Sequence, residues 1–417
     1  MSVRLAALIV NYNSGAFAEA CVASLHAGWD EAGYAREDLD VVVVDNASPA
    51  PQDEHLERLE AAGCVVVRSP DNLGYAGGMN LALAQTDDAA CAGNDLVAVL
   101  NPDLFFLPGS VRALVEFTSA RLDVGVVDPR AFVDPACELN LPRNLLPTLV
   151  DHTWMALSQL SPAICRAYSR HRLKKALPWW SAGEPLAAEM LSGCCMFLRR
   201  DVLRAEGMLL DDRFPLYYED TDLARRLSKR GLKLIHHGGA RVLHHWSRST
   251  GLVGHGESEA LTRYRVAQRA YFKKYYGGLG WRWVKLVNAL IAKWPRKWYD
   301  RPMHDLEPLG VFHEPVEVAL PRSCRFLVEM GMAPNFLLSA GLFGEGDRWR
   351  CPDLTWAWFF QARYFMRILD RDTGELLGAW TFDKAEPGRS EPLQLEEVWP
   401  AADPERDAER EDTEAKA

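Results

Sequence analysis

Four short apolar runs, each ended by a turn or a polar cluster, constrain this chain most. They occupy residues 5–10, 41–44, 65–68 and 96–100, and segments with helical spacing or a Gly-rich turn separate them. This alternation predicts the α/β class: a Rossmann-like, mostly parallel sheet with helices on both faces. Such sheets bind ligands beyond the carboxyl ends of their strands. The polar clusters at residues 11–14, 45–48 and 101–103 fall at those ends.

The pattern changes along the rest of the chain. Residues 135–185 are rich in Pro, Trp and Arg and favour a loop over a site. The segment "LKLIHHGGARVLHHWSRST" favours two short strands and a polar loop, and "EDTDLARRLSKRG" favours a helix ended by Gly231. After residue 311, short β-prone runs with a turn at "DRDTGE" indicate an antiparallel sheet.

We therefore expect four parts: an α/β domain (1–258), a helical basic and aromatic connecting segment (259–305), a small antiparallel β domain (306–400) and a disordered tail (401–417). The connecting segment has two interpretations. It is either a packed helical bridge or a surface that lies on an anionic membrane. Pro295 and the pair Gly277–Gly278 interrupt it, which favours the bridge.

Charge and cysteine content narrow the function classes. The formal net charge of −10 argues against a nucleic-acid binder. The nine cysteines have no metal-ligand spacing, and their odd number fits a reducing compartment. No basic leader precedes Leu5, and no run of about 20 apolar residues occurs. These features predict a cytoplasmic protein, with the inner face of the cell membrane as an alternative position.

Seven motifs in order resemble the family-2 glycosyltransferases of the GT-A fold, in particular their rhamnosyltransferase-like branch. They are "VNYNS", "VVVVDNAS", "DNLGYAGGMN", "VLNPD", "LSGCCMFLRRDVL", "YYEDTDLARRLSKRG" and "HHWSRST", between about residues 5 and 250. The resemblance implies inverting transfer from a UDP- or dTDP-sugar, dTDP-rhamnose among them. The implied acceptor is a glycan, lipid-linked or protein molecule in bacterial surface polysaccharide or glycoconjugate synthesis.

The resemblance also implies the residues that hold the nucleotide sugar. Asn11 and Asp45 would contact base and ribose, although Asp45 is equally suited to cap the next helix. The Gly-rich loop would bring its backbone close to the donor, and the loop after residue 245 would hold phosphate oxygens. The other members of this set are Asn72, Gly74, Gly77, Gly78, Asn80, Asn101, Arg248 and Ser249, with Thr250 beside them.

Asp103 corresponds to the last carboxylate of the metal-binding Asp-x-Asp motif, with Asn101 in place of the first Asp. Hard cations prefer oxygen ligands, so one carboxylate and diphosphate oxygens suffice for Mg²⁺ or Mn²⁺. By the same resemblance His244, or else His245, ligates this metal; an ordinary surface histidine is the alternative.

Three acids stand at the start of one expected helix. By resemblance Asp220 is the catalytic base, Glu219 is the alternative, and Asp222 orients the acceptor. Acids in a first turn also favour the helix dipole without any catalytic role. A sugar-binding or scaffold protein on the same fold is the other function. A nucleotidyltransferase is disfavoured because "NYNSG" has no Lys or Arg.

Tryptophans supply candidate sugar-stacking groups, with core packing as the alternative. They are Trp179 and Trp180 before the acidic motif, and Trp349, Trp356, Trp358 and Trp380 in the expected β domain.

Overall fold

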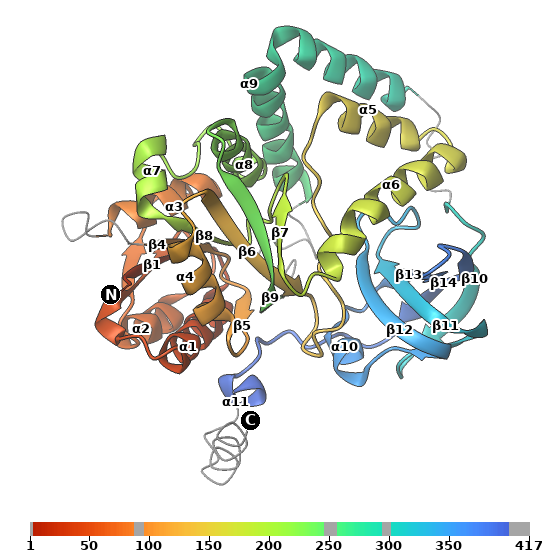
Figure 1. Cartoon of the computed structure of the whole chain (residues 1–417), viewed down its shortest axis with the longest axis horizontal. Coiled ribbons are helices and arrows are strands. Elements are labelled where there is room, and N and C mark those ends of the chain that lie inside the picture. Colours follow the sequence, from red (N-terminus) through yellow and green to blue (C-terminus); the bar gives the residue numbers. More distant parts are fainter. Residues whose placement is uncertain (1–2, 87–95, 246–256, 294–301, 400–417) are drawn as a thin grey trace.

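The protein is known here from a computed structural model that describes residues 3–86, 96–245, 257–293 and 302–399. Figure 1 shows a large α/β region, a group of helices and a second sheet. Arg248, Ser249, Thr250 and the expected tail lie outside the described residues.

The large sheet carries the N-terminal half of the chain. Its strands are β1 (Leu5–Asn11), β2 (Leu39–Asp45), β3 (Val65–Arg68), β4 (Leu96–Leu100), β5 (Leu104–Phe106), β6 (Val124–Phe132), β7 (Pro185–Ala188), β8 (Cys195–Arg199) and β9 (Lys233–His244). Their order is β3-β2-β1-β4-β8-β6-β9-β5, with β7 paired to β9. Strands β1 to β4 and the pair β6–β9 are parallel, whereas β8 runs against both neighbours. The predicted mostly parallel sheet is confirmed.

Helices cover both faces because successive strand residues point to opposite sides. On β1, Leu5 and Ile9 join the cluster that includes Leu25 of α1, while Leu8 and Val10 join the cluster that includes α3. These helices are α1 (Gly15–Glu31), α2 (Asp53–Ala61), α3 (Gly74–Ala84), α4 (Ser110–Ala120), α7 (Arg200–Glu206) and α8 (Glu219–Lys229), with a 3₁₀ turn at Arg36–Asp38.

Two sequence-based expectations about local structure are wrong. Residues 135–185 contain two helices, α5 (Leu149–Ser158) and α6 (Pro162–Trp180), in place of a loop. Thr148 and Ser161 cap these helices, and Pro162 at the first turn needs no hydrogen-bond donor. The segment read as two short strands is the single strand β9. The pairing of β9 with β6 shifts at Pro129/Arg130, so the Gly238–Gly239 pair is accommodated within one strand.

Helix α9 (Glu257–Ala292) is kinked at Gly277, which has φ 66° and ψ −169°. Figure 1 shows the first part of α9 running beside α8 and the second part lying along α5. Among the helices that the structure describes, none combines the length and hydropathy needed to cross a bilayer.

A second sheet follows, in the order β10-β14-β13-β11-β12. Its elements are β10 (Glu307–Phe312), β11 (Glu317–Gly331), β12 (Ala340–Arg350), α10 (Asp353–Trp358), β13 (Arg363–Asp370) and β14 (Leu376–Lys384), and α11 (Leu395–Val398) ends the described chain. All pairs are antiparallel except β10–β14. The small antiparallel sheet is thus confirmed, and the predicted turn at residues 370–375 joins β13 to β14.

This sheet packs closely on the first region. Leu327 and Leu369 lie in one cluster with Trp180, and the backbone N–H of Asn140 donates to Gly341 at 2.8 Å. The four tryptophans considered for glycan stacking are 6–8% exposed, so they are core residues. The domain boundaries stay a prediction; the second sheet has its own core around Phe326, Met366 and Ile368 and also packs on the first region through Leu327 and Leu369.

One buried ion pair links the second sheet to α6. Glu329 and Arg367 face each other on β11 and β13, each 2% exposed, and Arg367 Nε donates to Glu329 at 2.7 Å. Arg367 also donates to Ser169 Oγ on α6 at 2.8 Å, and Ser339 Oγ donates to Glu329. The carboxylate and guanidinium therefore compensate each other away from water.

We expect Arg367→Met to lower the free energy of unfolding by about 3–5 kcal/mol, because it leaves Glu329 buried without its partner. Arg363→Met is the matched control on the same strand, since the Arg363–Asp383 pair is exposed and such pairs are worth at most about 1 kcal/mol. Urea unfolding measures both variants. Equal losses would contradict the importance of the buried pair.

Candidate active site

Asn11 and Asp45 meet at the carboxyl ends of the adjacent strands β1 and β2. Asn11 is fully buried and its Nδ2 donates to Asp45 Oδ1 at 2.8 Å, while its Oδ1 accepts from the backbone and hydroxyl of Ser14. Ser48 Oγ donates to the same Asp45 oxygen at 2.6 Å. Asp45 Oδ2 accepts a longer hydrogen bond of 3.3 Å from Ser48 N, and Asp45 is half-buried.

The Gly-rich loop is held against the end of β2 by Asn46. Its Oδ1 accepts from Leu73 N at 2.9 Å and its Nδ2 donates to Gly74 O at 3.1 Å, while Asn72 Oδ1 accepts from Gly74 N. Gly74 has φ 73°, which favours glycine, and a Cβ there would lie 2.5 Å from Pro215 O.

The expected loop is shorter than predicted: α3 begins at Gly74, so Gly77, Gly78 and Asn80 lie inside the helix, and these positions also have structural explanations. A Cβ on Gly78 would lie 2.8 Å from Val10, and one on Gly77 would lie 2.9 Å from Leu73. Asn80 uses both amide atoms on the backbone of Leu210. The close packing of α3 therefore accounts for Gly74, Gly78 and Asn80. Their contact with a nucleotide-sugar donor stays a prediction.

Asn101, Asp103 and His244 come together at the ends of β4 and β9. His244 Nε2 lies 3.2 Å from Asp103 Oδ1 and 3.2 Å from Asn101 Nδ2. Asp103 is 1% exposed, and no hydrogen-bond donor of good geometry among the described residues reaches either carboxylate oxygen. Burial opposes ionisation of Asp103, but His244 and then His245 outweigh it, so the pKa of Asp103 lies below its ordinary value.

A buried carboxylate beside an imidazole is the kind of group that a divalent cation accepts as a ligand. Among the described residues no three His, Cys, Asp or Glu side chains converge on one position. A cation held here would therefore need further ligands, such as the oxygens of a substrate.

Tyr75 connects this acidic pocket to the second acidic motif. Its hydroxyl donates to Asn101 Oδ1 at 2.9 Å and lies 3.3 Å from Gly193 O. Gly193 N in turn donates to Asp220 Oδ2 at 3.3 Å. Burial, followed by the charge of Glu219, raises the pKa of Tyr75 well above its ordinary value, so its hydroxyl stays protonated. Sequence reasoning missed Tyr75 and Gly193, although both lie inside quoted motifs.

Glu219 and Asp220 begin α8 in a buried setting. Glu219 is 8% exposed and its Oε2 has no hydrogen-bond partner among the described residues. Burial and then the neighbouring Asp220 raise the pKa of Glu219 well above its ordinary value. Burial also raises the pKa of Asp220, although the backbone and hydroxyl of Thr221 partly offset this effect. Such groups take up a proton near neutral pH more readily than exposed carboxylates.

The backbone that presents these carboxylates is strained. Tyr217 and Tyr218 have φ values of 67° and 71°, a left-handed conformation that costs a non-glycine residue about 1–3 kcal/mol. The ring of Tyr218 packs on Tyr271 of α9 at 4.9 Å, and its hydroxyl lies 3.2 Å from that of Tyr264. Helix α9 therefore holds a turn that would not persist alone.

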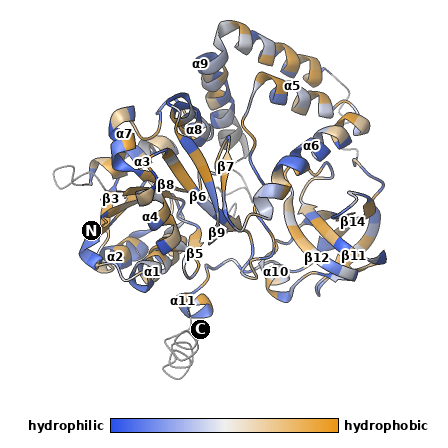
Figure 2. Cartoon of the chain, viewed as in Figure 1, coloured by the Kyte–Doolittle hydropathy of each residue, from blue (hydrophilic) through white to orange (hydrophobic). Residues whose placement is uncertain are grey.

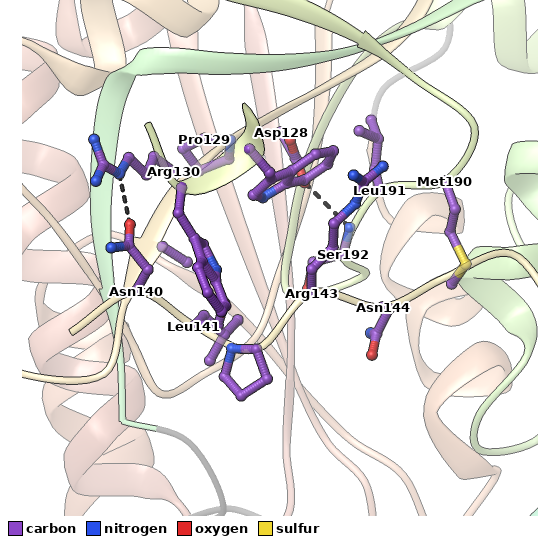
Figure 3. Close-up of a pocket in the computed structure, with 14 residues that line it drawn as sticks. Asp128, Pro129, Arg130, Asn140, Leu141, Arg143, Asn144, Met190, Leu191 and Ser192 are labelled. Carbon is purple, nitrogen blue, oxygen red and sulfur yellow. Dashed lines mark hydrogen bonds between the residues drawn. The ribbon is translucent and has the colours of Figure 1, made fainter. Parts of the chain in front are cut away.

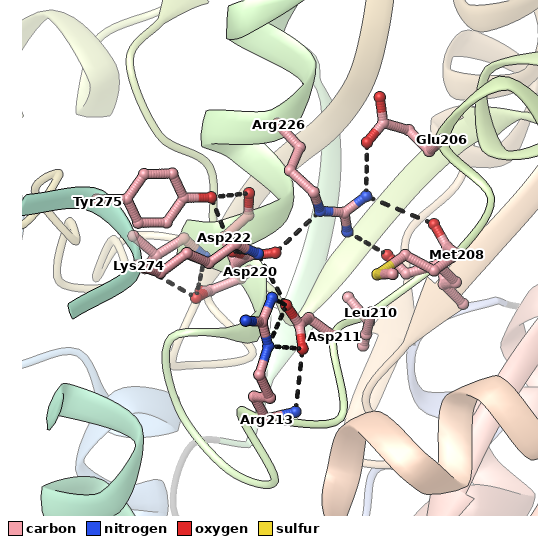
Figure 4. Close-up of polar contacts among 12 residues, drawn as sticks. Glu206, Met208, Leu210, Asp211, Arg213, Asp220, Asp222, Arg226, Lys274 and Tyr275 are labelled. Atoms are coloured by element: carbon pink, nitrogen blue, oxygen red, sulfur yellow. Dashed lines mark hydrogen bonds and ion pairs between the residues drawn. The ribbon is translucent and has the colours of Figure 1, made fainter. Parts of the chain in front are cut away.

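Asp222 differs from its neighbours because its carboxylate is already taken. It is fully buried, and it accepts from Tyr275 at 2.7 Å, from Arg226 at 2.9 Å and from Lys274 (Figure 4). Lys274 also binds Asp211 at 2.7 Å. The structure thus gives Asp222 the role of an anchor between α8 and α9, in place of the expected contact with an acceptor.

A second buried pair supports the segment that carries Gly193. Asp128 accepts from Ser192 N at 3.1 Å (Figure 3). Asp128 also lies 2.9 Å from His236 Nδ1. Trp179 stacks on His236 with ring centroids 3.8 Å apart, and Trp180 donates to Leu141 O. Both tryptophans are buried, so they form the support of the site and do not offer a stacking surface to a sugar.

A cavity of about 590 Å³ adjoins the strained turn. Tyr217, Tyr218 and Tyr264 line one side of it. Helices α5 and α6 contribute further lining residues, among them Asp151, Arg172 and Gln159. Aromatic rings with scattered polar groups suit a ligand that has apolar faces and hydroxyl groups.

The raised pKa of Glu219 predicts a pH-dependent stability. The native state keeps a proton that the unfolded chain releases above about pH 4.3, so stability falls as pH rises from there through the raised pKa. We expect Glu219→Gln to be more stable than the wild type at pH 8, with a smaller difference at pH 4. Chemical unfolding across this range measures it, with the exposed Glu391→Gln as control. A difference that does not change with pH would contradict this assignment.

The N-terminal part of the chain is similar in sequence to known proteins. Residues 6–175 match the sequence profile of "Glycosyl transferase family 2". The chain is 33% identical over 193 residues to the N-acetylglucosaminyl-diphospho-decaprenol L-rhamnosyltransferase of Mycobacterium tuberculosis, in two strains. That match covers 43% of this chain and 58% of the relative, so the chain spans less than two thirds of its length.

Solved structures also match parts of this chain at low sequence identity. They include mannosyltransferase PcManGT from Pyrobaculum calidifontis, with 15% identity and a TM-score of 0.39 over 69% of this chain and 75% of that one. GalNAc-T7 shares 14% identity with a TM-score of 0.42 over 91% of this chain and 72% of that one.

Proposed function

Residues 6–175 belong to glycosyl transferase family 2, and from this premise we propose that the protein transfers a sugar from a nucleoside diphosphate to an acceptor hydroxyl. One observation carries the proposal: the Asp103–His244 pair and the Glu219–Asp220 pair lie at the two ends of one chain of contacts through Asn101, Tyr75 and Gly193. Donor and acceptor chemistry both need such acidic groups, and the fold brings them together.

The donor side uses the strand ends. Asp45 Oδ2 is suited to accept the imide N–H of uracil or thymine, so we infer a UDP- or dTDP-sugar, with dTDP-rhamnose favoured by the mycobacterial relative. Asp103, His244 and Asn101 would hold Mg²⁺ or Mn²⁺ together with diphosphate oxygens. Such a cation neutralises the charge that develops on the leaving diphosphate.

The acceptor side uses Asp220. Its carboxylate takes the proton of the acceptor hydroxyl while that oxygen bonds to the anomeric carbon, and the bond from this carbon to the diphosphate oxygen breaks. One displacement inverts the anomeric configuration and releases the nucleoside diphosphate. The 590 Å³ cavity beside Tyr217 and Tyr218 is the proposed acceptor site, and a glycan or lipid-linked sugar of the bacterial envelope is the proposed class.

A sugar-binding or scaffold protein on this fold is the alternative. Buried carboxylates without partners lower stability, and a protein without catalysis gains by losing them. Among the described residues Glu219 Oε2 is such a group, which favours the enzyme.

We expect Asp220→Asn to lower kcat by 10²–10⁴-fold while donor binding is kept, because a general base contributes about that much. Glu219→Gln and Asp222→Asn are the companion variants. Turnover of each is measured per folded protein at a temperature below its Tm. If Asp220→Asn keeps the wild-type kcat and Glu219→Gln does not, the base is Glu219. A wild type that turns over no nucleotide sugar supports the scaffold.

The donor assignment predicts a ligand-dependent Tm. A UDP- or dTDP-sugar with Mn²⁺ should stabilise the wild type by about 2.7 kcal/mol at 100 times its Kd, and a GDP-sugar by less. EDTA or the substitution Asp103→Asn should remove most of this shift, whereas Asp383→Asn, an exposed carboxylate on β14, should not. An unchanged shift in EDTA would contradict metal-assisted donor binding.

A further inference from the structure

We propose that the helix pair formed by α5 and the part of α9 beyond its kink is a docking surface for an anionic lipid bilayer. The two helices pack along each other in the same direction. Leu149 lies near Gly280, Trp283 Nε1 donates to Thr153 Oγ1 at 2.8 Å, and Ala156 clusters with Val287 and Ile291. One face of each helix is therefore packed against the other helix, and the remaining faces are available for further contacts.

An exposed apolar stripe runs along α9. It consists of four residues with spacings of four, three and four, which places them on one helix face, and they are 46–78% exposed: Leu279, Trp283, Leu286 and Leu290. Each precedes by one position a residue of α9 that is buried. The stripe is thus not the packed face but the surface beside it.

Helix α5 continues the same surface. Val150 and Leu157 are 75% and 40% exposed, and each follows by one position a residue that packs toward α9. On two parallel helices that face each other, an offset of one residue forward on one helix and one residue backward on the other turns both sets to the same side. Figure 2 shows hydrophobic residues on both helices.

Basic residues around the apolar stripe favour an anionic membrane as the partner. Residues 262–293 contain eight Lys or Arg and no Asp or Glu, in a chain whose net charge is −10. Arg282, Lys285 and Lys293 are exposed on the same part of α9 as the stripe. Leucine and tryptophan on one face with flanking basic residues are the pattern of a helix that lies in the headgroup region of an anionic membrane.

The proposal combines the two interpretations of the connecting segment, a packed bridge and a membrane-facing surface. Before Gly277, α9 packs on α8 through Tyr271 and Lys274, as a bridge does. Beyond Gly277, it packs on α5 by one face only. Other residues of α5, Asp151 and Met155 among them, line the 590 Å³ cavity, so a docked membrane would lie one helix away from the proposed acceptor site.

Vesicle binding of the full chain tests the proposal. Vesicles of phosphatidylcholine alone are compared with vesicles that contain 30% phosphatidylglycerol, a mixture we choose, by co-sedimentation without donor. We expect binding to the anionic vesicles to be at least about ten-fold tighter, since each basic residue near the surface contributes about five-fold. The triple variant Leu279→Ser/Leu286→Ser/Leu290→Ser and the double variant Arg282→Glu/Lys293→Glu should each lose about ten-fold or more.

The controls separate this surface from the fold and from the donor site. Leu122→Ser and Leu354→Ser remove leucines that are 74% and 60% exposed elsewhere, and both should bind as the wild type does. All variants should keep the wild-type Tm and donor hydrolysis. Three results would each overturn the proposal and leave the proposed function intact. The wild type does not bind anionic vesicles, the stripe variants bind them as tightly as the wild type, or the wild type is a dimer that only the stripe substitutions dissociate.

Discussion

The site depends on the hydrogen bonds that the buried carboxylate of Asp222 accepts. It accepts hydrogen bonds from α8 itself, through Arg226, and from α9, through Lys274 and Tyr275. These bonds fix α9 against the start of α8, where the Tyr217–Tyr218 turn needs outside support. Asp222 therefore lets the adjacent carboxylates occupy a conformation that the local sequence disfavours.

The site concentrates groups that cost stability. Asp103 and Glu219 are buried carboxylates, Glu219 Oε2 has no hydrogen-bond partner among the described residues, and the two tyrosines before Glu219 have left-handed backbone conformations. The surroundings offset these costs through packed elements far away in sequence: α9, the Asp128–His236 pair and the buried Trp179 and Trp180. Structural support by distant elements is what allows a reactive cluster to stay ordered before substrate arrives.

The sequence predicts best those features that depend on neighbouring residues. The short apolar runs predicted strands β1 to β4. Because β1, β2 and β4 are parallel, the polar residues that follow them lie at one edge of the sheet: Asn11, Asp45, Asn101 and Asp103. Helices α5 and α6 escaped because Pro and Trp residues suggested a loop, whereas caps and long-range packing decide their structure.

Features set by distant partners were not predictable in this way. The motif "EDTDL" suggested that Asp222 orients an acceptor, but Lys274 and Tyr275 stand about fifty positions later and bind its carboxylate. Tyr75 gave no signal of its own, since only the fold places its hydroxyl between Asn101 and Gly193. The tryptophans of the second region are core residues: Trp349 and Trp380 point inward from β12 and β14, and Trp356 and Trp358 are buried on α10.

The last described residue also has a consequence for how the chain acquires its structure. Trp399 Nε1 donates to Phe106 O at 3.1 Å, across a separation of 293 residues, and Leu395 packs on the cluster of Phe105 and Leu243. During synthesis at about 5–20 residues per second, the edge strand that carries Phe106 waits roughly 15–60 s for this cover. In that interval the sheet edge lacks this cover, and an uncovered apolar strand edge is a place where other chains can pair.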